Sequence, residues 1–325
     1  MTPLPVHFLT IVLNGRPFLR HHAETFRALP FPWHWHVVEG AAALAHDTAW
    51  SLATGGRLDG AFHRGGRSVD GTEEELDAIA RALEGRVTLH RKPRGELWDG
   101  KLEMVNAPLA RIRRPCLLWE VDVDELWTSA QLVRGRDLFL AHPERRAAYY
   151  RCEYFVGEDL VVTTRDGYGN GPYEWLRTWR FRPGDRWLAH EPPVLVTRLE
   201  RWRQWRRLRR GKRPRLPFHP GDPAVFSKEE TEAAGLVFQH LAYVCEAQLR
   251  FKEAYYGYPD LVSRWRAMQA ETALPLRLST WFPWVKDDAL VGRASARGLV
   301  PLVAPSREGA SPTTAGAAPA GGGPA

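Results

Sequence analysis

Two aspartates follow an apolar run in the first half of the chain. Leu117–Val121 is apolar apart from Glu120, and Asp122, Asp124 and Glu125 come directly after it. Such a run predicts a buried strand whose tip presents carboxylates at the edge of a sheet, where open α/β sheets bind their ligands. Paired carboxylates suit a hard divalent cation, Mg²⁺ or Mn²⁺, which could in turn clamp a diphosphate. The alternative is an acidic turn that binds nothing.

Two histidines in the second half are candidates to complete such a metal site. Neutral imidazole suits these cations, and His190 precedes Glu191 and two prolines that form a rigid connection. His240 lies in a short apolar run. For each, the alternative is a histidine with an ordinary partner in the core or at the surface. His34 and His36 share one face of another predicted strand, where ordinary strand positions are favoured over a metal pair.

The positive charge of the chain is concentrated in one segment. The 325 residues carry a formal net charge of +7, and residues 198–215 hold ten Arg or Lys and one acid, Glu200. Subtracting that local +9 from the total leaves about −2 for the rest of the chain. Trp202 and Trp205 lie in the same segment, so a helical version would suit an anionic membrane surface. Contact with nucleic acid phosphates and a solvated loop are the alternatives.

Composition argues against several classes of protein. With 44% hydrophobic and 26% charged residues, the chain is ordinary for a globular protein that buries a full core. No apolar run is long enough to span a bilayer, and residues 1–5 lack the features of a secretory signal. Cys116, Cys152 and Cys245 are far apart, so free thiols in a reducing compartment are expected rather than a zinc site. We expect a cytoplasmic protein, with peripheral contact at the inner face of the membrane as an option for residues 198–215.

Strand and helix signals alternate through the first 130 residues. Predicted strands cover residues 7–13, 33–38, 87–90 and 116–121, and predicted helices cover residues 17–29, 72–85 and 98–109. Thr72 and Glu75 form a capping box at the start of the second helix, and Gly85 ends it. A strand-helix-strand order implies parallel strands joined by right-handed crossovers. We therefore expect an α/β fold with a doubly wound, mostly parallel sheet flanked by helices.

The second half has a different pattern. Predicted strands cover residues 147–155, 160–164, 177–181, 194–197 and 238–244, and predicted helices follow Ser227 and cover residues 248–256 and 259–271. We expect this β-rich and helical half, residues 131–297, to belong to the same domain as residues 1–130. Residues 298–325 are expected to form a disordered tail, since the sequence from about Ser306 lacks core-forming residues.

Three segments occur in an order seen in a known family. They are Thr10–Gly15, Ser68–Thr72 and the Asp-x-Asp of Val121–Glu125. On these, the chain from about residue 7 to 290 resembles family-2-like glycosyltransferases of the GT-A fold. It looks most similar to a bacterial subgroup through the short motifs Trp98-Asp99-Gly100-Lys101, His190-Glu191-Pro192-Pro193, Phe238-Gln239-His240 and Phe251-Lys252-Glu253-Ala254-Tyr255-Tyr256-Gly257-Tyr258.

The resemblance implies a metal-dependent transfer of a sugar from a nucleoside diphosphate donor to a glycan or lipid-linked acceptor. Asp122 and Asp124 would hold Mn²⁺ or Mg²⁺ on the diphosphate, where the metal neutralises the charge of the leaving group. Glu125 would orient them or contact the donor sugar. The chain departs from the family pattern in three places: Glu39 replaces the usual Asp, residues 41–66 are inserted before Ser68–Thr72, and no Glu-Asp or Gln-x-x-Arg-Trp segment follows the Asp-x-Asp.

Further residues would bind the donor by the same resemblance. Asn14, Glu39 and Asp70 would contact the base or ribose at the strand ends, and Lys101 would contact the diphosphate beside Asp122. The alternative for Asn14 and Asp70 is turn formation, because each precedes a glycine. The alternative for Lys101 is a solvated charge.

The sequence leaves the identity of the catalytic base open. An inverting transferase needs a group that deprotonates the acceptor hydroxyl, and Glu191 and Glu174 in the second half are equal candidates, with Glu125 a further catalytic candidate. Glu174 lies among Tyr173, Trp175 and Trp179, whose apolar rings would raise a carboxyl pKa and could stack on sugars. Ordinary packing is the alternative for these rings.

Two other classes of function remain. Nucleotidyl transfer shares the α/β core and the carboxylate-metal chemistry. A module that binds membrane or nucleic acid through residues 198–215 would need no active site, and nucleic acid is the less favoured partner.

Overall fold

The fold is built on one large mixed sheet. The computed structural model describes residues 4–212 and 217–304. Seven strands lie in the order β12-β6-β9-β4-β1-β2-β3. Their bounds are β1 Val6–Val12, β2 Trp33–Glu39, β3 Val87–His90, β4 Cys116–Glu120, β6 Ala147–Tyr149, β9 Leu176–Phe181 and β12 Val225–Phe226. Strand β9 runs antiparallel to both neighbours and the other neighbouring pairs are parallel, so the expected mostly parallel α/β sheet is present.

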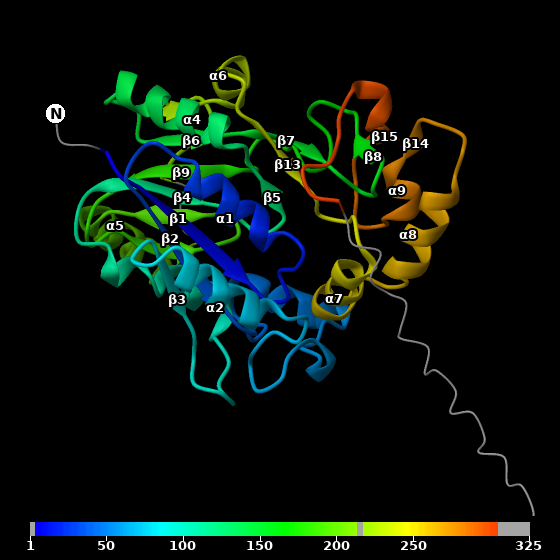
Figure 1. Cartoon of the computed structure of the whole chain (residues 1–325), viewed down its shortest axis with the longest axis horizontal. Helices are drawn as coiled ribbons and strands as arrows, with labels where there is room; N and C mark the ends of the chain where they lie inside the picture. The colour runs from blue at the N-terminus through cyan, green and yellow to red at the C-terminus, as the bar shows by residue number, and fades with distance from the viewer. Residues whose placement is uncertain (1–3, 213–216, 305–325) are drawn as a thin grey trace, which may run out of the picture.

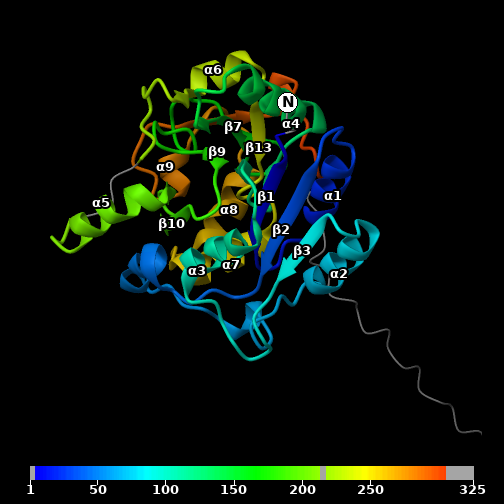
Figure 2. The same cartoon turned by 90° about the vertical axis from the view of Figure 1, so that its left-hand side faces the viewer.

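Helices cover both faces of this sheet. On one face lie α1 (Leu19–Arg27), α2 (Thr72–Ala82) and α4 (Ser129–Ala141), whose apolar residues share a buried cluster with alternate residues of β1, β2 and β4. On the other face lie α3 (Gly100–Asn106) and the hairpin of β10 (Arg186–Ala189) and β11 (Val194–Val196). Figure 2 shows α1 and α2 on one side of β1–β3 and α3 on the other. Alternation of buried side chains along each strand supplies both clusters.

The second half adds two small sheets and a group of helices. One sheet orders β5 (Glu125–Leu126), β13 (Val237–His240) and β7 (Arg151–Tyr154), and the other orders β14 (Leu276–Arg277), β15 (Leu290–Arg293) and β8 (Leu160–Val162). The helices are α5 (Arg198–Leu208), α6 (Lys228–Ala233), α7 (Glu246–Tyr256), α8 (Leu261–Ala270) and α9 (Leu278–Trp281). Short 3₁₀ segments are η1 (His46–Thr54), η2 (Gly60–Phe62), η3 (Leu109–Arg111) and η4 (Ser295–Arg297). Figure 1 places α7, α8 and α9 at one end of the molecule.

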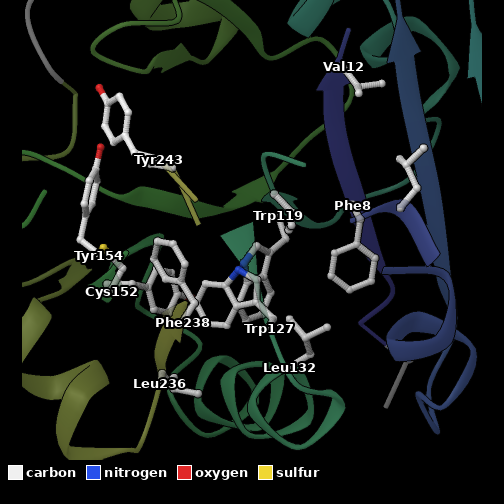
Figure 3. Close-up of a cluster of buried hydrophobic side chains, with 14 of the residues drawn as sticks. Phe8, Val12, Trp119, Trp127, Leu132, Cys152, Tyr154, Leu236, Phe238 and Tyr243 are labelled. Carbon is white, nitrogen blue, oxygen red and sulfur yellow. The ribbon is translucent and has the colours of Figure 1, made fainter. Parts of the chain in front are cut away.

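One aromatic cluster joins the two halves of the chain. The ring of Trp127 lies 5.1 Å from that of Trp119 on β4 and 4.8 Å from that of Phe238 on β13, and Tyr150 stacks on Trp119 at 5.6 Å. Figure 3 shows Trp127 between Trp119 and Phe238, with Phe8 of β1 on the far side of Trp119. Because this packing fixes β13 beside the tip of β4, it positions residues from both halves around one point. The division near residue 130 stays a prediction.

The structure differs from the predicted elements at three places. The strand predicted over residues 147–155 is two strands, because the pairing with β9 shifts register between Ala148 and Tyr149 and β7 joins another sheet. The helix predicted from residue 98 begins at Gly100, because Trp98 pairs with Ala42 as a β-bridge.

At the third place, α2 has no Thr72 capping box. Gly71 is its N-cap residue with φ 90°, and the Thr72 hydroxyl oxygen instead accepts the N–H of Gly15 at 2.7 Å. That bond ties the start of α2 to the end of β1.

The carboxyl-terminal segment is described only as far as residue 304. Within it, Gln239 on β13 donates from Nε2 to the carbonyl of Val300 at 2.8 Å and accepts from the N–H of Leu302 at 2.8 Å. The rest of the predicted tail, residues 305–325, lies outside the described residues. Within the described ranges, no helix combines the length and the apolar character needed to cross a bilayer.

Four histidines form a row across the parallel strands. Nδ1 of His7 on β1 lies 3.0 Å from Nε2 of His36 on β2, and Nδ1 of His36 lies 3.3 Å from Nε2 of His90 on β3. His34 instead bonds the Thr88 hydroxyl at 2.8 Å. Across residues 4–212 and 217–304, no three of these rings converge on one point as metal ligands would. His7 and His34 are half-buried and His36 and His90 are buried, so the row is a partly buried polar chain whose members have ordinary hydrogen-bond partners.

The histidine row should make stability depend on pH. Burial, with repulsion from His34, His7, His90 and Arg111, lowers the pKa of His36 to about 2, whereas an unfolded histidine titrates near 6.5. Below about pH 6.5 the unfolded chain therefore binds protons that the folded chain excludes, and stability falls. By about pH 5, His36 alone should cost about 2 kcal/mol.

The urea midpoint between about pH 7.5 and about pH 4.5 measures this effect. His36→Gln should flatten the decline, and His142→Gln, on a half-exposed side chain, should leave it as in the wild type. An equal decline in all three proteins would contradict a role for the row.

Candidate functional site

A cavity of about 1530 Å³ opens beyond the carboxyl ends of β1 and β4. Its other walls come from α7 and from the connection between β10 and β11, and Figure 1 shows the β1 arrow pointing toward α7. Nine of the eleven side chains that the sequence analysis singles out line it: Asn14, Asp70, Lys101, Asp122, Asp124, Glu174, His190, Glu191 and His240. Glu39 and Glu125 are fully buried and do not line it.

A buried arginine on β9 holds the carboxylates at the tip of β4. Arg177 donates from Nη2 to Asp122 at 2.8 Å and from Nε to both oxygens of Glu125, at 3.0 and 3.1 Å, and its Nη1 lies 3.4 Å from Glu120. Burial opposes the charge on Arg177, but these three carboxylates raise its pKa. The tip of β4 is thus an anionic cluster with one internal cation.

Glu125 is a positioning residue in this cluster. It has no exposed surface, and burial raises its pKa to about 8 even with the Arg177 guanidinium beside it. Its second oxygen accepts the N–H of Asp122 at 3.3 Å. Glu125 therefore holds the Arg177 side chain and the Asp122 backbone in place, and it does not itself line the cavity.

His190 approaches the same point from the β10–β11 connection. Its Nε2 lies 2.8 Å from a carboxylate oxygen of Glu120, at the end of β4. Burial lowers the pKa of His190, but the Glu120 carboxylate outweighs burial, so the pKa of His190 is raised. For Glu120, burial raises the pKa, but His190 and Arg177 outweigh burial and lower it. Asp47 in η1 holds the connection, since its carboxylate accepts the N–H groups of His190 and Glu191.

Lys101 and Glu191 form an ion pair on the cavity wall. Nζ of Lys101, on α3, lies 2.6 Å from Glu191 and 2.9 Å from the hydroxyl of Tyr256 on α7. Burial works against ionisation of Glu191, but Lys101 and His190 hold the pKa of Glu191 at about 2. At neutral pH Glu191 is therefore an anion with little tendency to take up a proton.

Asp124 faces a second group of side chains, His240 and Lys252. One carboxylate oxygen lies 3.4 Å from Nε2 of His240 and the other lies 3.7 Å from Nζ of Lys252. Burial raises the pKa of Asp124, but His240 and Lys252 outweigh burial and lower it well below its usual value. The four side chains expected to share one metal therefore separate into two groups, Asp122 with His190 and Asp124 with His240.

One set of three residues has the arrangement that a metal ion needs. Glu120, Asp122 and His190 each offer a ligand atom, and these atoms lie within 4.8 Å of one another. Oε2 of Glu120 and Nδ1 of His190 are buried and form no hydrogen bond within residues 4–212 and 217–304, although Nη1 of Arg177 lies 3.4 Å from that Oε2. Two carboxylates and one imidazole fit a divalent cation such as Mn²⁺. These residues therefore could hold a metal, with Glu120 in a place that the sequence analysis gave to Asp124.

Another part of the cavity wall is formed by segments that follow β1 and β2. Asn14 has φ 56°, in the left-handed region, and its amide group binds the carbonyl of Phe62 at 2.8 Å and the N–H of Val69 at 2.9 Å. The carboxylate of Asp70 accepts the N–H groups of Arg16 and Thr72 at 3.1 and 3.0 Å. Both side chains line the cavity while holding the loop that follows the insertion.

Glu39 acts deeper in the same wall. It accepts the N–H and hydroxyl of Ser68 at 2.9 and 2.8 Å, and its other oxygen lies 3.1 Å from Arg67 and 3.2 Å from Arg91. With no exposed surface, it anchors the Ser68–Thr72 segment to β2.

Glu174, Tyr173 and Trp175 line another part of the cavity. One oxygen of Glu174 accepts the N–H of Gly171 at 2.6 Å. Trp175 has φ 60°, a conformation that a bulky residue rarely adopts. Its ring lies 4.8 Å from that of His240 and 5.0 Å from the Arg177 guanidinium, and it lines the cavity. Such strain in a cavity wall is typical of functional sites.

Several site residues were missed from the sequence. Glu120 lies two positions before Asp122, and strand alternation alone would have placed both on one face. Arg177, Asp47 and Lys252 lie 55, 75 and 130 positions from Asp122 in the printed sequence, and no local pattern links them to it.

Comparisons with known proteins give no family assignment. No protein-family model and no curated protein matches the chain. Among solved structures, S. aureus TarS 1–349 matches with a TM-score of 0.36 at 10% identity over 55% of this chain, which spans about half (47%) of that one. A mannosyltransferase from Pyrobaculum calidifontis, in complex with GDP-Man and Mn²⁺, matches with a TM-score of 0.39 at 13% identity over 84% of this chain and 67% of that chain. Likenesses this weak carry no argument, so function is argued from the geometry of the site.

Proposed function

We propose that the chain is a metal-assisted glycosyltransferase that uses a nucleoside diphosphate sugar, with a family-2-like GT-A arrangement. The observation that carries the proposal is the group of Glu120, Asp122 and His190, placed where β4 opens into a large cavity. A carboxylate-imidazole group at the carboxyl end of a parallel strand suits an ion that binds a diphosphate. A cavity of about 1530 Å³ has room for a donor and part of an acceptor.

The chain's own charges suit this donor. When bound, Mn²⁺ or Mg²⁺ would supply Lewis-acid stabilisation of the leaving diphosphate. Lys101 and Lys252 line the cavity from α3 and α7 and would pair with phosphate oxygens. Asn14 and Asp70 would face the nucleoside at the ends of β1 and α2. Glu39 would act through the Ser68–Thr72 segment that it anchors, as a positioning residue.

We propose that His240 and Lys252 bind the same donor. Both flank Asp124, so Asp124 would hold these two side chains toward the cavity. On this assignment Asp124 acts by orienting His240 and Lys252, and it would contact the metal only through water.

Glu174 is the proposed base toward the acceptor hydroxyl, which would belong to a glycan or to a lipid-linked saccharide. It lines the cavity next to Tyr173, whose half-exposed ring could stack on a sugar. Glu191 is the weaker candidate because Lys101 lowers its pKa to about 2.

The chemistry of the released product tests the function. The chain is incubated with a panel of nucleoside diphosphate sugars and Mn²⁺, and the release of nucleoside diphosphate is measured, first to water and then to added saccharide acceptors. Release of pyrophosphate from nucleoside triphosphates, without turnover of any sugar donor, would replace the proposal with nucleotidyl transfer.

Removing the base should separate chemistry from binding. Glu174→Gln should lower kcat by about 100-fold or more and leave donor affinity within about twofold, since general-base catalysis typically contributes this much. Glu191→Gln should instead leave kcat near the wild-type value and strengthen donor binding, because it removes an anion from the cavity wall and frees Lys101 from its only carboxylate within 4.0 Å in the described chain. Transfer rates and calorimetric donor affinities measure the two effects, and the reverse pattern would exchange the assignments.

A further inference from the structure

Helix α5 extends from the body of the protein, as Figure 2 shows. Thr197 and Glu200 cap it reciprocally: the Glu200 carboxylate accepts the N–H of Thr197 at 2.9 Å, and the Thr197 hydroxyl accepts the N–H of Glu200 at 3.3 Å. The hairpin strand β11 leads directly into it. The helix is therefore fixed at its start while much of its length faces solvent.

Three apolar residues of α5 are exposed to solvent. Leu199, Trp202 and Trp205 are 71%, 57% and 49% exposed, whereas Gln204 is only 7% exposed. Spacings of three residues place Leu199, Trp202 and Trp205 within one third of the helix circumference. A surface helix of a globular protein normally buries its apolar stripe and exposes its polar face. In α5 the apolar stripe is instead exposed together with several of the arginines, which indicates that the stripe has an apolar partner outside this chain.

Cations surround the exposed stripe. The described residues 198–212 contain eight Arg or Lys and a single acid, Glu200. The Arg206 guanidinium lies 4.7 Å from the Trp202 ring centroid, and the Arg209 guanidinium lies 4.4 Å from that of Trp205. These contacts hold positive charge on the same face as the indoles. The partner should therefore combine an apolar layer with negative charge at its surface.

We propose that α5 docks on the surface of an anionic lipid bilayer. Leu199, Trp202 and Trp205 would enter the boundary between headgroups and acyl chains, and the flanking arginines would contact lipid phosphates. Indole side chains favour that boundary because one part is apolar and the N–H is polar. An anionic bilayer would therefore contact both the arginines and the apolar stripe of α5.

Nucleic acid fits the same surface less well. Bases bind single-strand-binding proteins by stacking on open aromatic faces. Here Arg206 and Arg209 lie over the two indoles, and Leu199, the most exposed of the three, has no role in stacking. Nucleic acid is therefore the alternative outcome of the test.

Sedimentation with vesicles tests the proposal on the full chain. Wild-type protein should co-sediment with vesicles of phosphatidylcholine and phosphatidylglycerol and not with phosphatidylcholine alone. Arg206→Glu/Arg209→Glu should lower the vesicle partition coefficient by more than about tenfold, since each basic residue near an anionic surface contributes about a factor of five. Trp202→Ala/Trp205→Ala should lower it at moderate salt, where apolar insertion carries the remaining affinity.

Matched variants control for charge and apolar surface. Arg27→Glu/Arg81→Glu makes the same change of charge on α1 and α2, which lie on the opposite side of the molecule from α5 in Figure 2. Val300→Ala/Leu302→Ala removes exposed apolar surface outside α5. Both should bind vesicles as the wild type does. Equal losses in the α5 and control variants would overturn the proposal, as would wild-type protein that ignores anionic vesicles. Binding of an RNA oligonucleotide that the α5 variants lose, without vesicle binding, would assign the surface to nucleic acid.

Discussion

Asp122→Asn should lower sugar transfer by about 100-fold or more while leaving the fold intact. Asp122 is the one carboxylate of the proposed metal set that is partly exposed to the cavity, at 28% of its side chain. Removing its charge weakens the hold on a divalent ion and thus the stabilisation of the leaving group, an electrostatic effect of about 10²–10³ in other enzymes. Arg177 keeps Glu120 and Glu125 as partners, so the thermal midpoint should move by no more than about 2 °C.

Two readouts separate this prediction from a general loss of activity. Calorimetric titration of the donor with and without Mn²⁺ should show that the variant has lost the metal-dependent part of its affinity. Asp137→Asn, on the outer surface of α4, makes the same chemical change at a 61% exposed side chain and should behave as the wild type. Donor affinity that Mn²⁺ enhances equally in Asp122→Asn and the wild type would remove Asp122 from the metal site.

The sequence predicted the location of the site because local patterns decide it. The apolar run of β4 and the polar residues after it indicate a strand end, and parallel strands bring such ends to one edge of a sheet. Nine of the predicted side chains line one cavity, but only some follow from strand ends; others, such as Asp70 and Lys101, were implied by the family resemblance. The pairing of the side chains could not be predicted in this way. The chain turns directly after Asp122, where the N–H of Glu125 bonds the Asp122 carbonyl at 2.9 Å, so alternation fails and Asp124 faces β13.

Local sequence patterns could not predict which side chains far apart in the chain would contact one another. Arg177 sits 55 positions after Asp122 on a predicted strand, and arginine is rarely buried unless it is paired. Its burial follows from three carboxylates that only the antiparallel pairing of β9 with β4 brings near. Residues 198–215 show a related limit: the sequence left a membrane-binding helix, a nucleic acid contact and a solvated loop as alternatives, and only the structure shows a helix over Arg198–Leu208 with exposed indole rings.

Arg177→Met should destabilise the protein by about 3–5 kcal/mol. The substitution leaves Glu120, Asp122 and Glu125 together without their shared guanidinium, and an uncompensated buried charge carries a cost of this size. Urea unfolding near neutral pH measures it. Should the variant not be obtained folded, Arg177→Lys keeps one charge but loses the fork that bonds two carboxylates at once, and a smaller loss is expected.

Divalent metal should partly reverse that loss. Mn²⁺ bound by Glu120, Asp122 and His190 would supply positive charge next to the point from which Arg177 was removed, so it should raise the thermal midpoint of Arg177→Met more than that of the wild type. Arg151→Met is the matched control. Arg151 is also buried and bridges three carboxylates, but Asp166 and Glu229 are 68% and 65% exposed and can return to water, so its loss should be smaller and Mn²⁺ should have no effect. Equal responses of the two variants to Mn²⁺ would show that the cluster at the tip of β4 does not bind the ion.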